Sequence, residues 1–248
     1  MKKLTEMGLN RTGVDSSPID SKDIIGAALN STPTSLDGDE EIGKIRASYI
    51  MNAKPLGTLP VPGTIKGGVS TILEKLAGNR PELLIDKLGE RLAFERTGTR
   101  LYEAIVQKCR VLDSDRAGIP VATLERFRDQ ELRHFGLVRD ALMSLGADPT
   151  AQTPAADAAA VASGGILKVV SDPRTSVLQS FEAILIAELA DFESWDMLIR
   201  VAEEMELKEI AASFRGAYDE EKVHLETIRS WLSDLMLTKK TAVKESAA

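Results

Sequence analysis

Four stretches of the chain place apolar residues at alternating spacings of three and four, which is the pattern of one buried face of an α-helix. These faces run from Leu88 to Cys109, from Leu124 to Leu145, from Val177 to Ala202 and from Leu207 to Leu235. We expect the first helix to cover residues 81–112 and Gly146 to end the second as its C′ residue. Asp172-Pro173 is expected to supply the N-cap and first residue of the third helix.

The connections between these helices predict how they are arranged. The first and second helices, and the third and fourth, are joined by short links, which make neighbouring helices antiparallel. Between the second and third lies a long, Ala-rich piece, residues 147–172, which can run the length of a bundle. The pattern therefore predicts an all-α fold, a four-helix bundle with one long crossover between helices two and three.

Each of the four apolar faces is interrupted by a glutamate, and two also carry a histidine. A carboxylate in a helical core costs several kcal/mol unless it is paired, protonated or bound to metal. Glu131 and His134 form a Glu-x-x-His motif, as do Glu221 and His224, and these two histidines are the only ones in the chain. Residues three apart share a helix face, so each motif can offer an oxygen and a nitrogen to one ion.

The other two helices supply one glutamate each, Glu95 and Glu188. Glu95 lies 36 residues before Glu131, and Glu188 lies 33 before Glu221. These spacings carry the chain out along one helix and back along the next to the same level. The second hairpin repeats the first, so we expect one layer with two equivalent ions, four carboxylates and two histidines.

This constellation resembles the di-iron carboxylate proteins of the ferritin-like superfamily, in particular its bacterioferritin and rubrerythrin branch, over residues 81–237. The resemblance implies that Glu95 and Glu188 are terminal ligands and that Glu131 and Glu221 bridge the ions. His134 and His224 would each bind one ion. It further implies two iron ions, with manganese possible, that react with O2 or peroxide, as a ferroxidase or peroxidase in iron or oxidative-stress handling.

Several functions remain open at this stage. The oxygen and nitrogen ligands, without thiolate, suit iron or manganese and, less specifically, zinc. A single cysteine cannot build the rubredoxin module of rubrerythrins, so electrons would come from an external donor. The alternatives are iron storage in a shell, a non-catalytic scaffold and a manganese catalase. Bundles of this family usually pair, so a homo-oligomer, a dimer or larger, is expected.

Some neighbours of the six candidates admit two interpretations. Glu220 could replace Glu221 as a ligand, but the pattern favours Glu221. Asp191, one turn from Glu188, could be an extra ligand or proton relay, but a position on the surface or directly behind the ligands is favoured. Tyr102 and Trp195 could carry electrons or protect against stray oxidation, although ordinary core packing is favoured.

The first 80 residues differ in composition from the rest. They contain one aromatic residue, Tyr49, and many Ser, Thr, Gly and Pro. Such a stretch buries too little apolar surface to order itself. We expect residues 1–80 to form an arm that is largely irregular or disordered, with short helices near 40–52 and 68–78, and residues 238–248 to form a flexible tail.

Charge and cysteine content exclude several classes of protein. The net charge of −7 argues against general binding to nucleic acid or to an anionic membrane. No run of 18 apolar residues predicts a transmembrane helix, and no apolar segment follows the N-terminus as in a secretory signal, so the expected location is cytoplasmic. Cys109 is alone, which excludes an internal disulfide, and its place on the apolar face predicts a core residue.

Overall fold

The computed structural model describes residues 18–30, 36–59, 81–112 and 118–237, and all regular secondary structure within these ranges is helical. The expected all-α class is therefore confirmed for this part of the chain. The described residues fall into two compact units, one before Gly57 and one from Gly57 onward.

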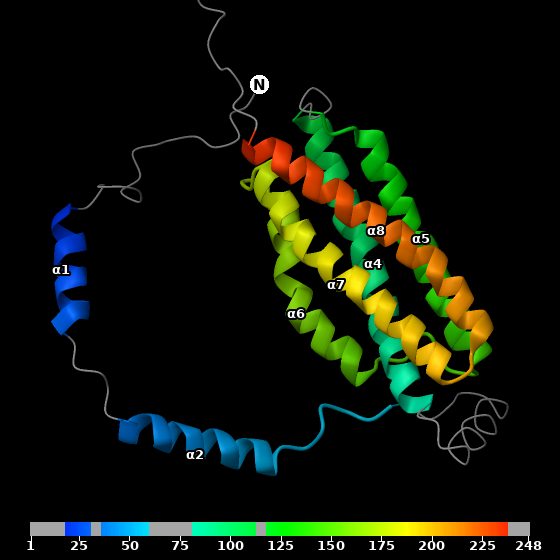
Figure 1. Cartoon of the computed structure of the whole chain (residues 1–248), viewed down its shortest axis with the longest axis horizontal. Helices are drawn as coiled ribbons and strands as arrows, with labels where there is room; N and C mark the ends of the chain where they lie inside the picture. The colour runs from blue at the N-terminus through cyan, green and yellow to red at the C-terminus, as the bar shows by residue number, and fades with distance from the viewer. Residues whose placement is uncertain (1–17, 31–35, 60–80, 113–117, 238–248) are drawn as a thin grey trace, which may run out of the picture. The chain divides into compact units, whose positions relative to one another are not determined.

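The described residues of the larger unit form five helices, which are α4 (Pro81–Val111), α5 (Val121–Ser144), α6 (Pro154–Ser171), α7 (Val177–Glu204) and α8 (Lys208–Leu237). In Figure 1, α4 and α5 run in opposite directions, as do α7 and α8. Helix α4 packs against α5, α6 and α7, while α8 packs against α7 and α5. Helix α6 lies in the connection between α5 and α7 and runs back along the other helices (Figure 1).

Local sequence explains where these helices begin and end. Gly146, with φ of 76°, follows α5 in the left-handed conformation, as expected of a C′ residue. The expected start of the third long helix was wrong, because Asp172 caps the C-terminus of α6. Helix α7 begins instead after Ser176, whose side chain forms a capping box with Gln179.

The core consists of two apolar clusters separated by a polar layer. One cluster is built around side chains such as Tyr102, Phe127, Phe181, Ile228 and Trp231, and it includes the buried Cys109, as expected. The other is built around Leu88, Val138, Trp195, Leu198 and Phe214. Burial of each large side chain stabilises the fold by roughly 1.5–3 kcal/mol. Along α4, α5, α7 and α8, the interrupting glutamates and histidines lie between the two clusters.

Where the structure describes the smaller unit, it shows two helices in a region expected to be largely irregular. They are α1 (Pro18–Asn30) and α2 (Leu36–Asn52), and the helix expected near 40–52 lies within α2. Both expose large apolar side chains, among them Leu29 and Tyr49. The helix expected near 68–78 and the tail 238–248 lie outside the described residues.

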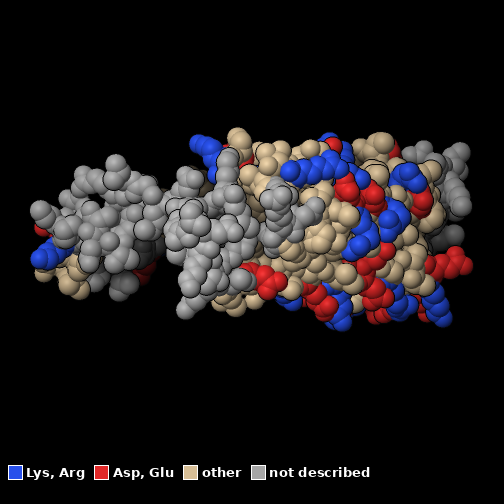
Figure 2. Space-filling view, turned by 90° about the horizontal axis from the view of Figure 1, so that it is seen from above, with Lys and Arg blue, Asp and Glu red and all other residues tan. Residues whose placement is uncertain are grey.

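Two observations concern the prediction that neither nucleic acid nor a membrane is a partner. On the face seen in Figure 2, basic and acidic side chains are interspersed rather than separated by sign. Within the described ranges, none of the helices combines the length and apolar character needed to cross a membrane.

Candidate metal centre

The six candidate ligands meet in one buried layer formed by four helices. Helix α4 supplies Glu95, α5 supplies Glu131 and His134, α7 supplies Glu188, and α8 supplies Glu221 and His224. None of the six is more than 3% exposed. The periodicity of the four apolar faces thus placed all six side chains correctly in the interior.

Their donor atoms form overlapping groups in which all atoms lie within 4.8 Å of one another. One group contains Glu95, His134 and Glu221. A second contains Glu131, Glu188, Glu221 and His224. Glu221 belongs to both groups, and a third group joins Asp191 to three of the glutamates. The layer therefore offers two histidine-containing sets of ligands linked by a shared carboxylate.

His134 is held with one ring nitrogen facing the carboxylates and the other facing away. Its Nδ1 lies 2.7 Å from Glu221 Oε1 and 3.7 Å from Glu95 Oε2. Its Nε2 lies 2.8 Å from Glu220 Oε2. A proton on Nε2 would be donated to Glu220, which leaves the Nδ1 lone pair directed into the layer. Glu220 thus contacts the outer side of the ring, and Glu221 is the residue that faces inward.

His224 repeats this arrangement on the other side of Glu221. Its Nδ1 lies 3.1 Å from Glu221 Oε2 and 3.4 Å from Glu131 Oε1. Its Nε2 lies 3.0 Å from Gln130 Oε1, an acceptor for the outer proton. Gln130 therefore fixes this ring as Glu220 fixes the other, and the two imidazoles present equivalent nitrogens to the carboxylates.

Many polar atoms of the layer are buried without a hydrogen-bond partner. Such atoms normally cost about 1–3 kcal/mol each. Three of the six candidates contribute an oxygen that also has no charged group within hydrogen-bond distance, namely Glu95 Oε2, Glu131 Oε2 and Glu188 Oε2. Lone pairs that converge without donors are what a bound cation would satisfy.

Burial and crowding shift the pKa values of these groups. Burial, reinforced by the charge of Glu221, raises the pKa of Glu131 and of Glu188 well above the ordinary value. Burial alone would lower the pKa of His134, but contacts with Glu221 and Glu95 outweigh it and raise that pKa to about 11. Without metal, the layer therefore retains protons that a cation would displace.

No family model, curated protein or solved structure matches this chain. The chemistry of the layer is therefore inferred from its own donor atoms. Carboxylate oxygens and imidazole nitrogens without thiolate are ligands of iron, manganese and zinc.

Arg91 is a charged neighbour that the sequence pattern did not single out. It is 2% exposed, its Nε lies 2.9 Å from Glu95 Oε1, and its Nη1 lies 2.8 Å from Asp191 Oδ1. Asp191 is thus buried beside the layer and paired to a cation, which excludes a surface position for it. The only sequence signal for Arg91 is its place four residues before Glu95, on the same helix face.

Gly98 is a second neighbour that the sequence pattern missed. A Cβ at this position would lie 2.0 Å from Glu131 Oε2 and 2.7 Å from Glu131 Cδ. The glycine therefore leaves the space that the Glu131 carboxylate fills. A glycine inside a long helix, one turn after a candidate ligand, was the available signal.

Tyr102 and Trp195 are both buried, as expected of core residues. Tyr102 also donates a hydrogen bond of 2.6 Å to Glu188 Oε1. Trp195 meets His134 edge-on, with 5.7 Å between ring centroids. Both rings therefore pack against candidate ligands and restrict their movement.

Proposed function

We propose that this chain is a di-metal carboxylate protein of the ferritin-like type, with two iron ions that react with O2 or peroxide. The observation that carries the proposal is the pair of imidazole Nδ1 atoms facing one shared carboxylate, that of Glu221. His134 and Glu95 complete one set of ligands. His224, Glu131 and Glu188 complete the other.

The charge of the layer supports two divalent ions. The four glutamates and Asp191, when ionised, carry five negative charges, and Arg91 balances one of them. Two divalent cations would balance the remaining four. They would thereby remove both the repulsion among the carboxylates and much of the cost of burying them.

The residues around the layer suit a site that reacts with a small oxidant. A pair of bound iron ions would supply the capacity to exchange electrons with O2 or peroxide. The two apolar clusters on either side exclude bulk water from the layer. Glu220 and Gln130 hold the imidazoles in place, and the Tyr102 hydroxyl holds a proton at Glu188 Oε1.

Single-turnover oxidation tests this function. The protein is loaded with Fe(II) without oxygen and mixed with O2 or peroxide, and Fe(III) formation is followed by absorbance. We expect rapid oxidation in the wild type and in Glu182→Ala, which alters an exposed residue of α7. We expect its loss in Glu131→Ala.

Other outcomes of the same experiment would replace the proposal. Bound metal that reacts with neither oxidant would favour a non-catalytic scaffold. A shell-sized native mass with many iron ions per chain would favour storage. Rapid peroxide disproportionation only after loading with Mn(II) would favour a manganese catalase.

A further inference from the structure

Glu95 and Glu188 occupy corresponding places in the two halves of the buried layer. Glu95 Oε2 lies 3.7 Å from His134 Nδ1, and Glu188 Oε2 lies 3.8 Å from His224 Nδ1. Each glutamate therefore turns one oxygen toward the inner nitrogen of a histidine. The other oxygen, Oε1, contacts a second buried side chain, which comes from α4 in both halves.

The two side chains from α4 differ in charge. Arg91 places its Nε 2.9 Å from Glu95 Oε1, so a guanidinium shares this carboxylate. The Tyr102 hydroxyl donates a hydrogen bond of 2.6 Å to Glu188 Oε1, so a neutral group holds the other carboxylate. Arg91 and Tyr102 are 2% and 1% exposed, which keeps solvent from screening this difference. An ion beside Glu95 would therefore meet a fixed positive charge, whereas an ion beside Glu188 would not.

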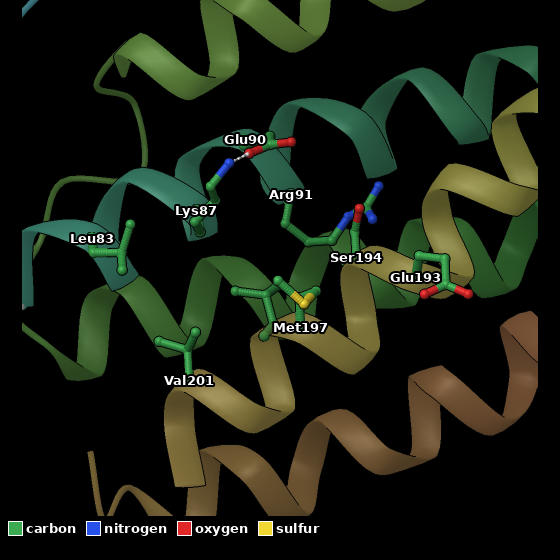
Figure 3. A pocket seen from close by; sticks show the side chains of 9 residues that line it. Leu83, Lys87, Glu90, Arg91, Glu193, Ser194, Met197 and Val201 are labelled. Atoms are coloured by element: carbon green, nitrogen blue, oxygen red, sulfur yellow. Dashed lines mark hydrogen bonds and ion pairs between the residues drawn. The ribbon is translucent and has the colours of Figure 1, made fainter. Parts of the chain in front are cut away.

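Asp191 offsets part of the charge of Arg91. The Arg91 side chain extends from α4 toward α7 in Figure 3, and its Nη1 lies 2.8 Å from Asp191 Oδ1. Asp191 also lies within 4.8 Å of ligand atoms of Glu95, Glu131 and Glu221. The negative charge of Asp191 therefore acts on both halves of the layer, whereas the guanidinium contacts Glu95 directly.

The two sets of ligands also differ in their number of carboxylates. The set that contains His134 has two, those of Glu95 and Glu221. The set that contains His224 has three, those of Glu131, Glu188 and Glu221. A divalent cation is held more tightly where more carboxylates surround it and no fixed cation lies beside them. Both differences therefore favour the His224 set.

The outer partners of the histidines act in the opposite direction, but weakly. Glu220 contacts His134 Nε2, and an anionic acceptor makes an imidazole a stronger ligand than does the neutral Gln130 beside His224. The Glu220 side chain is 35% exposed and is also paired with Arg133 at 3.0 Å. Solvent and this second cation reduce its effect. The difference in buried charge therefore determines which set binds an ion more tightly.

We propose that the two positions of the metal centre are unequal, so that the His224 set binds the first ion and the His134 set binds the second more weakly. Arg91 is the positioning residue that lowers the affinity of the His134 set, because it occupies one oxygen of Glu95. The repeat in the sequence predicts two equivalent ions, and the side chains beside the ligands make them differ.

This inference rests on the proposed di-metal centre, but the two can be distinguished. Two ions that bind with equal affinity would leave the proposed function in place and overturn the inequality. Two unequal ions that react with neither O2 nor peroxide would do the reverse. A wild type that binds no metal would overturn both.

Titration of the full chain with Mn(II) counts the binding steps. Calorimetry gives the affinity of each step, and electron paramagnetic resonance distinguishes an isolated Mn(II) ion from a magnetically coupled pair. We expect two steps in the wild type, the first at least about tenfold tighter than the second. The isolated-ion spectrum should appear first and give way to the coupled spectrum.

Arg91→Met tests the origin of the inequality, because it removes the charge and keeps an unbranched side chain. We expect the second Mn(II) to bind at least about threefold more tightly and the first to bind as in the wild type. Arg91→Lys keeps the charge and should keep the wild-type ratio of the two affinities. A general loss of packing would not strengthen one step alone, and a ratio unchanged in a folded Arg91→Met would overturn the role of Arg91.

Matched histidine substitutions identify which set binds first, whether or not Arg91→Met folds. His134→Ala should bind one Mn(II) with the affinity of the first step. His224→Ala should lose this tight step. A single step for both ions in the wild type, equal effects of the two substitutions, or loss of the tight step in His134→Ala alone would overturn the proposal.

Discussion

Gly98 determines where the Glu131 carboxylate can lie. Because a Cβ there would lie 2.0 Å from Glu131 Oε2, Gly98→Ala must displace this carboxylate. We expect metal affinity to fall at least about tenfold, even though alanine favours the helix by roughly 1 kcal/mol. Equilibrium dialysis against Fe(II) or Mn(II) measures the affinity.

Gly216 provides the matched control, because it lies in α8 with open space around its Cβ position. Gly216→Ala should leave metal affinity unchanged and raise the free energy of unfolding by up to about 1 kcal/mol. Wild-type metal affinity in Gly98→Ala would show that the close approach to Glu131 is unimportant.

Glu220 acts on the metal centre through the outer nitrogen of His134. Removal of this acceptor in Glu220→Ala frees the imidazole to rotate, and such partners usually contribute about 10–100-fold to metal affinity. We expect a loss of this size, measured by competition with a chelator. Glu220→Gln keeps an accepting oxygen and should lose less metal affinity than Glu220→Ala. Wild-type metal affinity in both variants would contradict this role of Glu220.

The residues of the layer show what sequence could and could not predict. The six candidates were placed in the interior because helical periodicity and the i, i+3 spacing determine which face each side chain occupies. Their role as metal ligands stays a prediction. Arg91 and Gly98 were not found, because their importance depends on which atoms of α7 and α5 come close to α4.

The start of α7 depends on its capping box. Ser176 accepts a hydrogen bond from the backbone of Gln179, and the Gln179 side chain accepts one from the backbone of Ser176. Ser176→Ala should therefore lower the free energy of unfolding by about 1 kcal/mol, as measured by urea denaturation. Ser213→Ala, on the exposed side of α8, should change it by less than about 0.5 kcal/mol. Equal effects would contradict the capping role.

Helix boundaries were predicted less well than helix faces. Asp172-Pro173 has the composition of a helix start, but α6 extends to Ser171 and uses Asp172 as its C-cap. The crossover was predicted from its length alone, since an Ala-rich segment has no distinct apolar face that would mark it as a helix. Helix α1 was not expected, because composition averaged over the first 80 residues hides a short helical segment.

The metal-free protein should lose stability as the pH rises. Glu131, Glu188 and His134 have pKa values raised above those of the unfolded chain. A group whose pKa is raised by folding contributes its full stabilisation when the pH is below its pKa in the unfolded chain. This stabilisation is lost as the pH rises through its pKa in the folded chain. The pKa of Glu221 is lowered to about 2, so this residue changes the free energy of unfolding only under more acidic conditions.

Thermal melting of the metal-free protein between about pH 5 and about pH 9 measures this dependence. We expect the Tm to fall across this range and the stabilisation by metal to grow, because bound metal displaces the retained protons. Glu131→Gln/Glu188→Gln, which cannot titrate at these positions, should flatten the curve. A Tm of the metal-free wild type that rises with pH would contradict the proposed protonation of the layer.

The most direct test of the di-metal centre is elemental analysis of the purified chain beside Glu131→Ala/Glu221→Ala. The double variant removes the carboxylate of Glu221, which both sets share, and the carboxylate of Glu131, which belongs to the set with His224. Neither ion therefore keeps all of its ligands. We predict about two iron or manganese ions per chain in the wild type and their loss in the variant. A wild type that binds neither metal after anaerobic incubation with Fe(II) and Mn(II), or a variant that binds as much as the wild type, would contradict the proposed centre.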